Sequence, residues 1–146
     1  MSRRTSIVRA LAERLKTIDG TSPYITNLQD QCFAKLKFWD EVNDFPSVYL
    51  SPGTEVREYH PADFAWGMLG VCVKVYCKSE DNAQEQLEDL LTDLETCIDA
   101  NRQLVYDLDK NYETTEILID SITTDEGLLA PYAVGEINLQ VRYQIM

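Results

Sequence analysis

Hydrophobic positions along the chain recur at two spacings, one typical of helices and the other typical of strands. Apolar residues three and four positions apart predict a helix over residues 6–18, capped by Thr5 or Ser6, and a second helix over residues 82–99. The second helix carries leucines on one face and acidic or polar residues on the other. Each helix therefore has one side suited to packing on a core.

Alternating apolar positions predict the strands. Residues 66–78 are apolar on both faces, as in a central strand, and Gly67 and Gly70 indicate a bulge or a close backbone approach. Residues 133–145 alternate strictly, so the polar face of the sheet is expected to be wet, or covered only in an assembly. The other expected elements are a weak strand or short helix at 31–38, strands at 46–50 and 113–123, and a short helix or turn at 100–108.

The order of helix, strands, helix and strands predicts an α+β fold. We expect an antiparallel or mixed sheet of about four to five strands, with the helices packed on one face. At 146 residues, 45% of them hydrophobic, the whole chain (1–146) is expected to form a single domain. Roughly residues 51–66 join two strands but are too polar in their middle to be core. They are predicted to form an extended β-hairpin arm.

Charge is large and unevenly placed. The net charge of −12 disfavours sequence-independent binding to nucleic acid or anionic membranes, although DNA could slide past an acidic wall. Residues 1–16 hold five basic residues and one acid, whereas residues 80–99 hold eight acids and no base. The two helices could pair within the chain or between subunits, or they could simply present two solvated faces. No apolar run approaches ~20 residues, so we expect no membrane partner.

Candidate chemistry is sparse. Phosphate-binding and nucleophile motifs are absent, and the four cysteines form no C-x-x-C pair, which predicts free thiols in a reducing compartment. His60 could act as a general base if Glu58 or Asp63 oriented it, but its charged loop indicates a surface residue. The acids of the second helix could hold a divalent cation, but solvated acidic faces are commoner. We therefore predict no catalysis, no metal and no cofactor.

Interaction surfaces remain as the candidate functional sites. An arm cannot bury its own length, so it becomes useful by lying on a neighbouring subunit or adding to its sheet edge, the alternative being a surface loop without a partner. The linker at 124–133 exposes apolar residues, which indicates a partner or a flap over the core. The predicted contact residues are Thr54, Glu55, Val56, Arg57, Glu58, Tyr59, His60, Leu128, Leu129 and Tyr132.

The layout of the chain resembles a known family. An amphipathic helix with the pattern R-x-S/T-I-x-x-A-L-x-x-R-L-K-x-I-D-G, here R-T-S-I-V-R-A-L-A-E-R-L-K-T-I-D-G, spans Arg4 to Gly20. It is followed by W-x-E at Trp39 to Glu41, F-P-S-V at Phe45 to Val48 and G-x-E at Gly53 to Glu55. A hydrophobic strand, a leucine-striped acidic helix and an alternating strand close the chain. This order resembles the tail terminator and tail-completion proteins of long-tailed, lambda-like bacteriophages.

The resemblance implies a structural protein of the virion without catalysis or cofactor. Such subunits form a hexameric ring that caps the tail tube, stops its growth and offers a surface to the head–tail connector, while DNA passes through the lumen. The ring would lie at the head-proximal end of the tail after assembly in the host cytoplasm. Acids that could face the lumen are Glu85, Glu88, Asp89, Asp107 and Asp109.

Three other functions compete with the terminator. A head–tail connector or neck ring shares the size and the lack of chemistry. A small non-catalytic ligand-binding α+β domain would need a polar pocket and would stay a monomer or dimer. An enzyme that uses His60 comes third.

Overall fold

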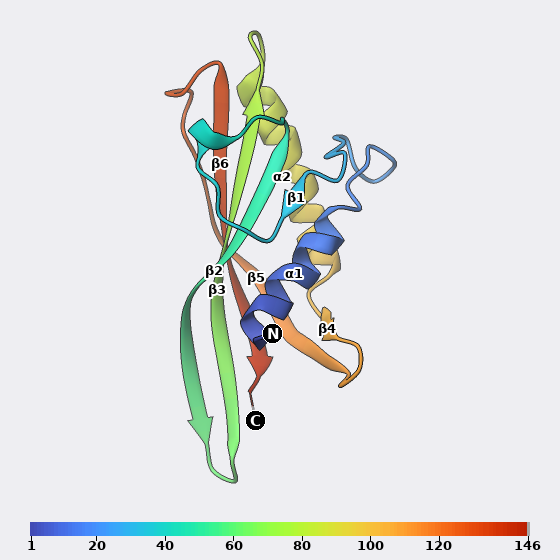
Figure 1. Ribbon diagram of the computed structural model, residues 1–146, viewed down its shortest axis with the longest axis vertical. Helices are drawn as coiled ribbons and strands as arrows, with labels where there is room; N and C mark the ends of the chain where they lie inside the picture. Colours follow the sequence, from blue (N-terminus) through green and yellow to red (C-terminus); the bar gives the residue numbers. More distant parts are fainter. Residues whose placement is uncertain (146) are drawn as a thin grey trace.

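The computed structural model describes residues 1–145 as one six-stranded sheet with two helices (Figure 1). The sheet is long and twisted, and two of its strands continue well beyond the helices as a hairpin (Figure 1). In chain order the elements are α1 (Arg3–Leu15), β1 (Cys32–Phe33), a 3-10 turn (Trp39–Glu41), β2 (Ser47–His60), β3 (Phe64–Lys78), α2 (Ala83–Ala100), β4 (Val105–Asp107), β5 (Tyr112–Thr124) and β6 (Tyr132–Gln144).

The strands lie in the order β1-β2-β3-β6-β5-β4. All neighbours are antiparallel except β1 and β2, so the sheet is mixed and the expected α+β class is confirmed. The expected number of strands was too low, because β1 and β4 are only two and three residues long and too short for an alternation pattern to reveal.

The core lies between the helices and one face of the sheet. Strand β3 is central, as predicted, and points Leu69, Val71, Val73 and Val75 into this core, where each is at most 1% exposed. The apolar stripes of α1 and α2 pack on the same face, as expected. A Cβ added at Gly135 of β6 would lie 3.1 Å from Leu87 Cδ1, so the absent side chain lets α2 approach the sheet closely.

The opposite face of the sheet is only partly open. Its upper half is covered by the segment between β1 and β2, in which Val42 packs with Tyr49 and Tyr76 as a second buried cluster. The Tyr76 hydroxyl donates to the Lys37 carbonyl at 2.5 Å and ties that segment down. The expectation of a wet face was therefore wrong for this half. The alternation of β6 shows which residues face outward but not which loop folds over them.

Several element boundaries differ from those expected. Helix α1 begins at Arg3 rather than at residue 6, because the Ser2 hydroxyl accepts the Thr5 backbone N–H and caps the helix. The strand expected at 31–38 shrinks to Cys32–Phe33. Within 100–108 the helix ends at Ala100, a turn follows, as one of the two alternatives expected, and Val105–Asp107 form β4, beside which the buried Thr114 hydroxyl accepts the Leu104 N–H at 2.9 Å.

The cysteines are free, as predicted. Cys32, Cys77 and Cys97 are buried and Cys72 is partly buried. Burial raises the pKa of the Cys32 and Cys77 thiols to about 12, which keeps them protonated and unreactive at neutral pH.

One acid of α2 has a structural role that its sequence position hides. Asp93 is 1% exposed, and its carboxylate accepts hydrogen bonds from the backbone N–H groups of Ile25 and Thr26, at 3.0 and 2.6 Å. The Thr26 hydroxyl donates to it as well, at 2.5 Å. These bonds fix the loop after α1 to α2 and leave few of the carboxylate's acceptor sites empty.

Replacing Asp93 with alanine should therefore lower the free energy of unfolding by about 3 kcal/mol, because buried N–H groups lose their acceptor. Denaturant unfolding would measure the change. The matched control is Glu88→Ala on the exposed face of the same helix, expected within about 0.5 kcal/mol of the parent protein. Equal effects of the two substitutions would contradict the role of Asp93 as a clamp.

Candidate functional site

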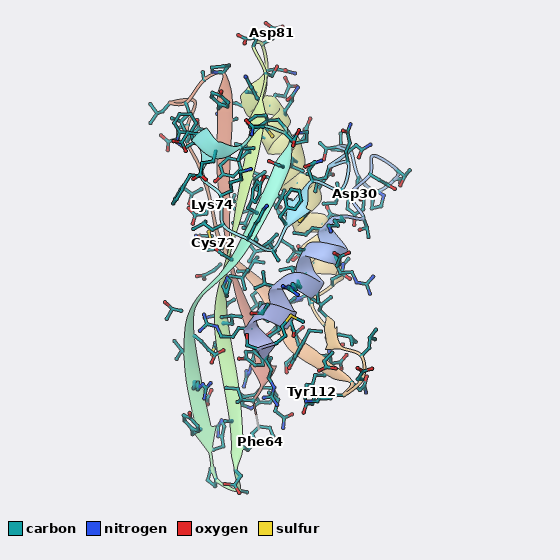
Figure 2. The ribbon with its side chains drawn as sticks, viewed as in Figure 1. Asp30, Phe64, Cys72, Lys74, Asp81 and Tyr112 are labelled. Carbon is teal, nitrogen blue, oxygen red and sulfur yellow. The ribbon has the colours of Figure 1, made fainter. Side chains whose placement is uncertain are left out.

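The predicted arm is formed by the lower halves of β2 and β3. Their pairing ends at His60 with Phe64, and β3 stays paired with β6 as far as Trp66, so only Tyr59–Ala65 lie beyond the last pair with β6. A short turn at residues 61–63 closes the hairpin, with Ala62 and Asp63 both at positive φ. Phe64 lies near the free end of the arm, far from either helix (Figure 2).

The two faces of the arm differ in character. Residues paired across two strands lie on the same face, so Val56, Glu58 and His60 share one face with Met68, Trp66 and Phe64. On that face Phe64 and Trp66 meet edge to face at 5.2 Å, and the Arg142 guanidinium stacks 4.7 Å from the Trp66 ring. The other face carries Glu55, Arg57 and Tyr59 of β2 beside Leu69, Gly67 and Ala65 of β3. The first face is thus mainly apolar and aromatic, and the second combines polar side chains of β2 with small or buried residues of β3.

The root of the arm is anchored to the body by Glu55. Its carboxylate accepts hydrogen bonds from the Tyr143 hydroxyl and from Arg57 Nε, the latter at 3.0 Å, and its side chain is only 7% exposed. Burial alone would raise the pKa of Glu55, but the hydrogen bonds and the nearby arginine charges outweigh it and lower this pKa. Arg4 of α1 donates to the Gly53 carbonyl close by.

A close backbone approach at the arm's root was correctly predicted from the glycines. A Cβ added at Gly70 would lie 3.3 Å from the Thr54 carbonyl oxygen, across a register shift between Pro52 and Glu55. A Cβ added at Gly67 would meet the Tyr143 ring at 2.8 Å. The two glycines therefore let β2 bulge and let Tyr143 reach Glu55.

The contact residues predicted on the arm are mostly exposed. All of Thr54–His60 are exposed apart from Glu55, with 59% of Val56 and 63% of Tyr59 open to solvent. His60 Nε2 lies 3.1 Å from Glu58 Oε1, so the pair that we considered for base catalysis does form. It stands on an exposed strand end without walls that could hold a substrate, which does not fit a catalytic site.

The predicted contact residues in the linker between β5 and β6 differ in how exposed they are. Leu128 is 85% exposed, whereas Leu129 and Tyr132 are half-buried. The Tyr132 ring packs 5.5 Å from Trp39, on the segment that covers the upper face of the sheet. We call Trp39, Leu128 and Tyr132 the loop-end patch, which lies at the opposite end of the molecule from the arm's tip (Figure 1).

Sequence reasoning missed Trp39 and its neighbours as part of this surface. Trp39 is 40% exposed, and Leu36 and Phe38 just before it are 53% and 56% exposed. The sequence did contain an indication of this surface, the adjacent aromatic residues Phe38 and Trp39 in a polar segment. An irregular segment has no repeating buried face, so such residues are not expected to be fully buried.

The acids proposed to face a lumen fall into two separate groups. Glu85, Glu88 and Asp89 lie in the first turns of α2, and the first two are exposed. Asp107 is the last residue of β4, which follows the other end of that helix, and Asp109 lies two residues further on. Within residues 1–145 no three acidic, cysteine or histidine side chains are placed to hold a metal ion. No ion pair links α1 to α2 in this range either, so the suggested pairing of the two helices within the chain is not formed.

The surface offers troughs rather than a closed pocket. One open depression lies beside Arg3 and Tyr112, and another lies over the exposed face of the sheet near Cys72. Figure 2 shows Cys72 and Lys74 near the middle of the sheet, and Tyr112 at the lower end of the body. Neither helix in residues 1–145 has the length and apolar character needed to cross a membrane.

The comparisons with known proteins agree with this site, which consists of surfaces rather than a pocket. The family model described as "Bacteriophage Tail Tube Terminator Protein" matches residues 1–146. The chain belongs to this family. It is 40% identical to the tail tube terminator protein p142 of Escherichia phage T5, over 99% of this chain and 95% of that protein. Terminators are structural components of the virion tail, and the resemblance expected from the sequence is confirmed.

A solved structure supports the fold independently. A chain in the virion of a native gene transfer agent particle superposes with a TM-score of 0.61 at 10% identity, covering 98% of this chain and 99% of that one. At this identity the likeness concerns the fold alone. The terminator fold described here is therefore found in another virion-like particle with little sequence in common.

The anchor of the terminator's arm should be measurable as an energetic coupling between Glu55 and Tyr143. In a double-mutant cycle with Glu55→Gln and Tyr143→Phe, we expect a coupling of about 1–2 kcal/mol at about pH 7. Because folding lowers the pKa of Glu55, its carboxylate stabilises the fold above the ordinary value of 4.5, and this contribution is lost as pH falls through the lower folded-state pKa.

The same cycle repeated near pH 3 should therefore give a smaller coupling, measured by denaturant unfolding at both pH values. A coupling near zero at neutral pH, or one that does not change with pH, would contradict an ionised anchor.

Proposed function

We propose that this terminator forms a hexameric ring that caps the head-proximal end of the tail tube, stops its elongation and presents a surface to the head–tail connector. Assembly of the ring would take place in the host cytoplasm. The observation that carries the proposal is the arm, a long paired hairpin with exposed apolar side chains in a chain that belongs to the terminator family.

The energetics of the arm favour a partner. Val56 and Tyr59 remain more than half exposed, and Phe64 and Trp66 are only partly buried. An isolated two-stranded hairpin is marginally stable in water. Contact with a neighbouring subunit would bury these side chains and stabilise the hairpin. A ring supplies such a contact to every subunit once.

The two ends of the molecule suit two different partners. The arm's tip projects from one end and the loop-end patch covers the other, so a ring with its axis roughly along the strands would present one on each side (Figure 1). One side would meet the tail tube and the other the head–tail connector. A cap that must join two different structures needs two such surfaces.

Charge fits the passage of DNA without specific binding. A subunit of net charge −12 gives an assembly that repels the phosphate backbone. The exposed acids Glu85 and Glu88, with Asp89, remain the candidates for the lumen, together with Asp107 and Asp109. If both groups line the lumen, α2 must lie along it, because they flank its two ends. This placement stays a prediction.

The competing functions are weaker. A neck connector would share the arm and the charge, but the family match favours the terminator. A ligand-binding domain would need an enclosed polar site, whereas the described depressions are open. A non-enzymatic role fits the family, and His60 stands on an exposed tip.

The ring is tested by shortening the arm on both strands together. Replacing Tyr59–Ala65 with Asn-Gly closes the hairpin at the Glu58–Trp66 pair, the last level at which β3 pairs with β6, and keeps Arg57 and Tyr143 on Glu55. We expect a folded subunit that no longer forms rings or caps tubes, as measured by circular dichroism, native mass and electron micrographs. The parent protein should give rings, alone or on tubes.

Two outcomes would count against the proposal. Rings formed by the shortened variant would remove the arm as the subunit contact, and an unfolded variant would mean that the arm is core. His60→Ala serves as the matched control, because it alters the tip without shortening it. It should keep tube capping, and this result would remove the enzyme that uses His60 from consideration.

The loop-end patch gives a separate prediction. Leu128→Glu changes a side chain that is 85% exposed, so the free energy of unfolding should change by no more than about 0.5 kcal/mol. We expect rings to form normally but to lose attachment at one of their two faces, scored as tubes left uncapped or capped tails that fail to join heads. Glu126→Lys, exposed on the same loop but outside the loop-end patch, is the control and should keep both attachments.

A further inference from the structure

The sheet of this terminator ends in two free edges, one on each side of the molecule. Strand β1 pairs with β2 only at Val48 and Tyr49, so within residues 1–145 no strand lies on the outer side of Ser51–His60, opposite β3. Strand β4 pairs with β5 only at Tyr112 and Glu113, near the start of β5, so the outer side of 115–124, opposite β6, is also without a strand in these residues. Each edge presents backbone N–H and C=O groups that can pair with another strand.

The directions of the two edge strands allow them to meet. Between them lie β3 and β6, and each step from β2 to β3 to β6 to β5 is antiparallel. Strands β2 and β5 therefore run in opposite directions. Rotation about an axis along the strands preserves direction, so β5 of one copy would meet β2 of the next as an antiparallel neighbour. The contact is heterologous, which is the kind that closes rings.

The free stretches of β2 and β5 also overlap along the strand direction. Following the paired residues across the sheet places Ser51 level with Ser121, and Val56 level with Glu116. The two edges thus overlap even without an offset, and closing a sheet into a barrel adds an offset of its own. Register shifts in β2 after Pro52 and in β5 after Ile119 are bulges, which give sheets the curvature that closure needs.

The β5 edge has only part of the usual protection against pairing. Edge strands are commonly blunted by lysine or proline, yet 115–124 contains neither; its charges are Glu116 and Asp120, and it is rich in isoleucine and threonine, which favour strands. Leu118 and Ile122 are each 39% exposed there, and Val56 on the opposite edge is 59% exposed. A second copy would cover apolar side chains on both edges at once.

The geometry points to edge-to-edge pairing between copies of this chain, in which Thr54–His60 of β2 adds as an antiparallel strand to 115–124 of the next copy's β5. The sheets would then join into one continuous wall around the ring. This inference rests on the proposed ring and specifies which backbone edges close it. Pro52 has no N–H to donate, so pairing would start after it.

Engineered disulfides test the pairing directly. Val56→Cys or Glu58→Cys on β2 is combined with Glu116→Cys or Leu118→Cys on β5, all on the outward face, in a Cys72→Ser background that removes the partly exposed native thiol. Within one chain the two edges are three strand spacings apart, about 14 Å, too far for a disulfide. A bond must therefore join two copies.

We expect at least one of these register combinations to give a reducible ladder of cross-linked subunits in assembled rings or capped tubes. Val56→Cys with Leu128→Cys, which lies outside the edge, is the control and should give no ladder. If rings form but no combination gives more cross-linking than this control, the edge pairing is overturned while the proposed ring still stands. Absence of any ring, alone or on tubes, would overturn the proposed function and this inference with it.

Discussion

The antiparallel pairing of β3 with β2 on one side and β6 on the other is the interaction on which the rest of the structure depends. Its inward residues, such as Val73, hold both helices to the sheet, and its lower half continues as one strand of the arm. Core and arm are thus one ladder rather than a body with an attached loop. Any force on the arm's tip is transmitted through main-chain hydrogen bonds to the centre of the core.

The pattern of apolar residues predicted the helix and strands that line the core. Helix α2, central β3 and alternating β6 were all expected, because burial on one side leaves a clear period in the sequence. What it could not predict depends on single polar contacts. The Thr114 hydroxyl accepts the Leu104 N–H and holds the segment before β5 against that strand, and the Asp93 carboxylate accepts the Thr26 N–H in the loop after α1. Both residues look like surface positions in the sequence. The cover over Tyr49 and Tyr76 was missed because an irregular segment supplies it.

The candidate surfaces could be predicted from the sequence only where a local pattern marks them. A polar stretch between two strong strands must project, so the arm could be expected from composition alone. The loop-end patch could be expected only in part, since Leu128 is exposed but Tyr132 packs on Trp39, which lies more than ninety residues earlier in the chain. Pairing across such a distance leaves no local pattern. The anchor of the arm, Glu55 on Tyr143, is hidden for the same reason.

A terminator has to be soluble as a subunit and yet associate strongly at one place. The chain separates these needs in space. Its charge is concentrated on the exposed face of α2, where repulsion between subunits does not oppose pairing at the sheet edges. The arm's edge carries Glu55, Arg57 and Glu58, which discourage indiscriminate strand pairing, whereas the β5 edge carries only two charges, Glu116 and Asp120, among apolar and hydroxyl side chains. Two like arms would therefore associate poorly, and an arm meeting a β5 edge is the contact that buries apolar surface on both partners.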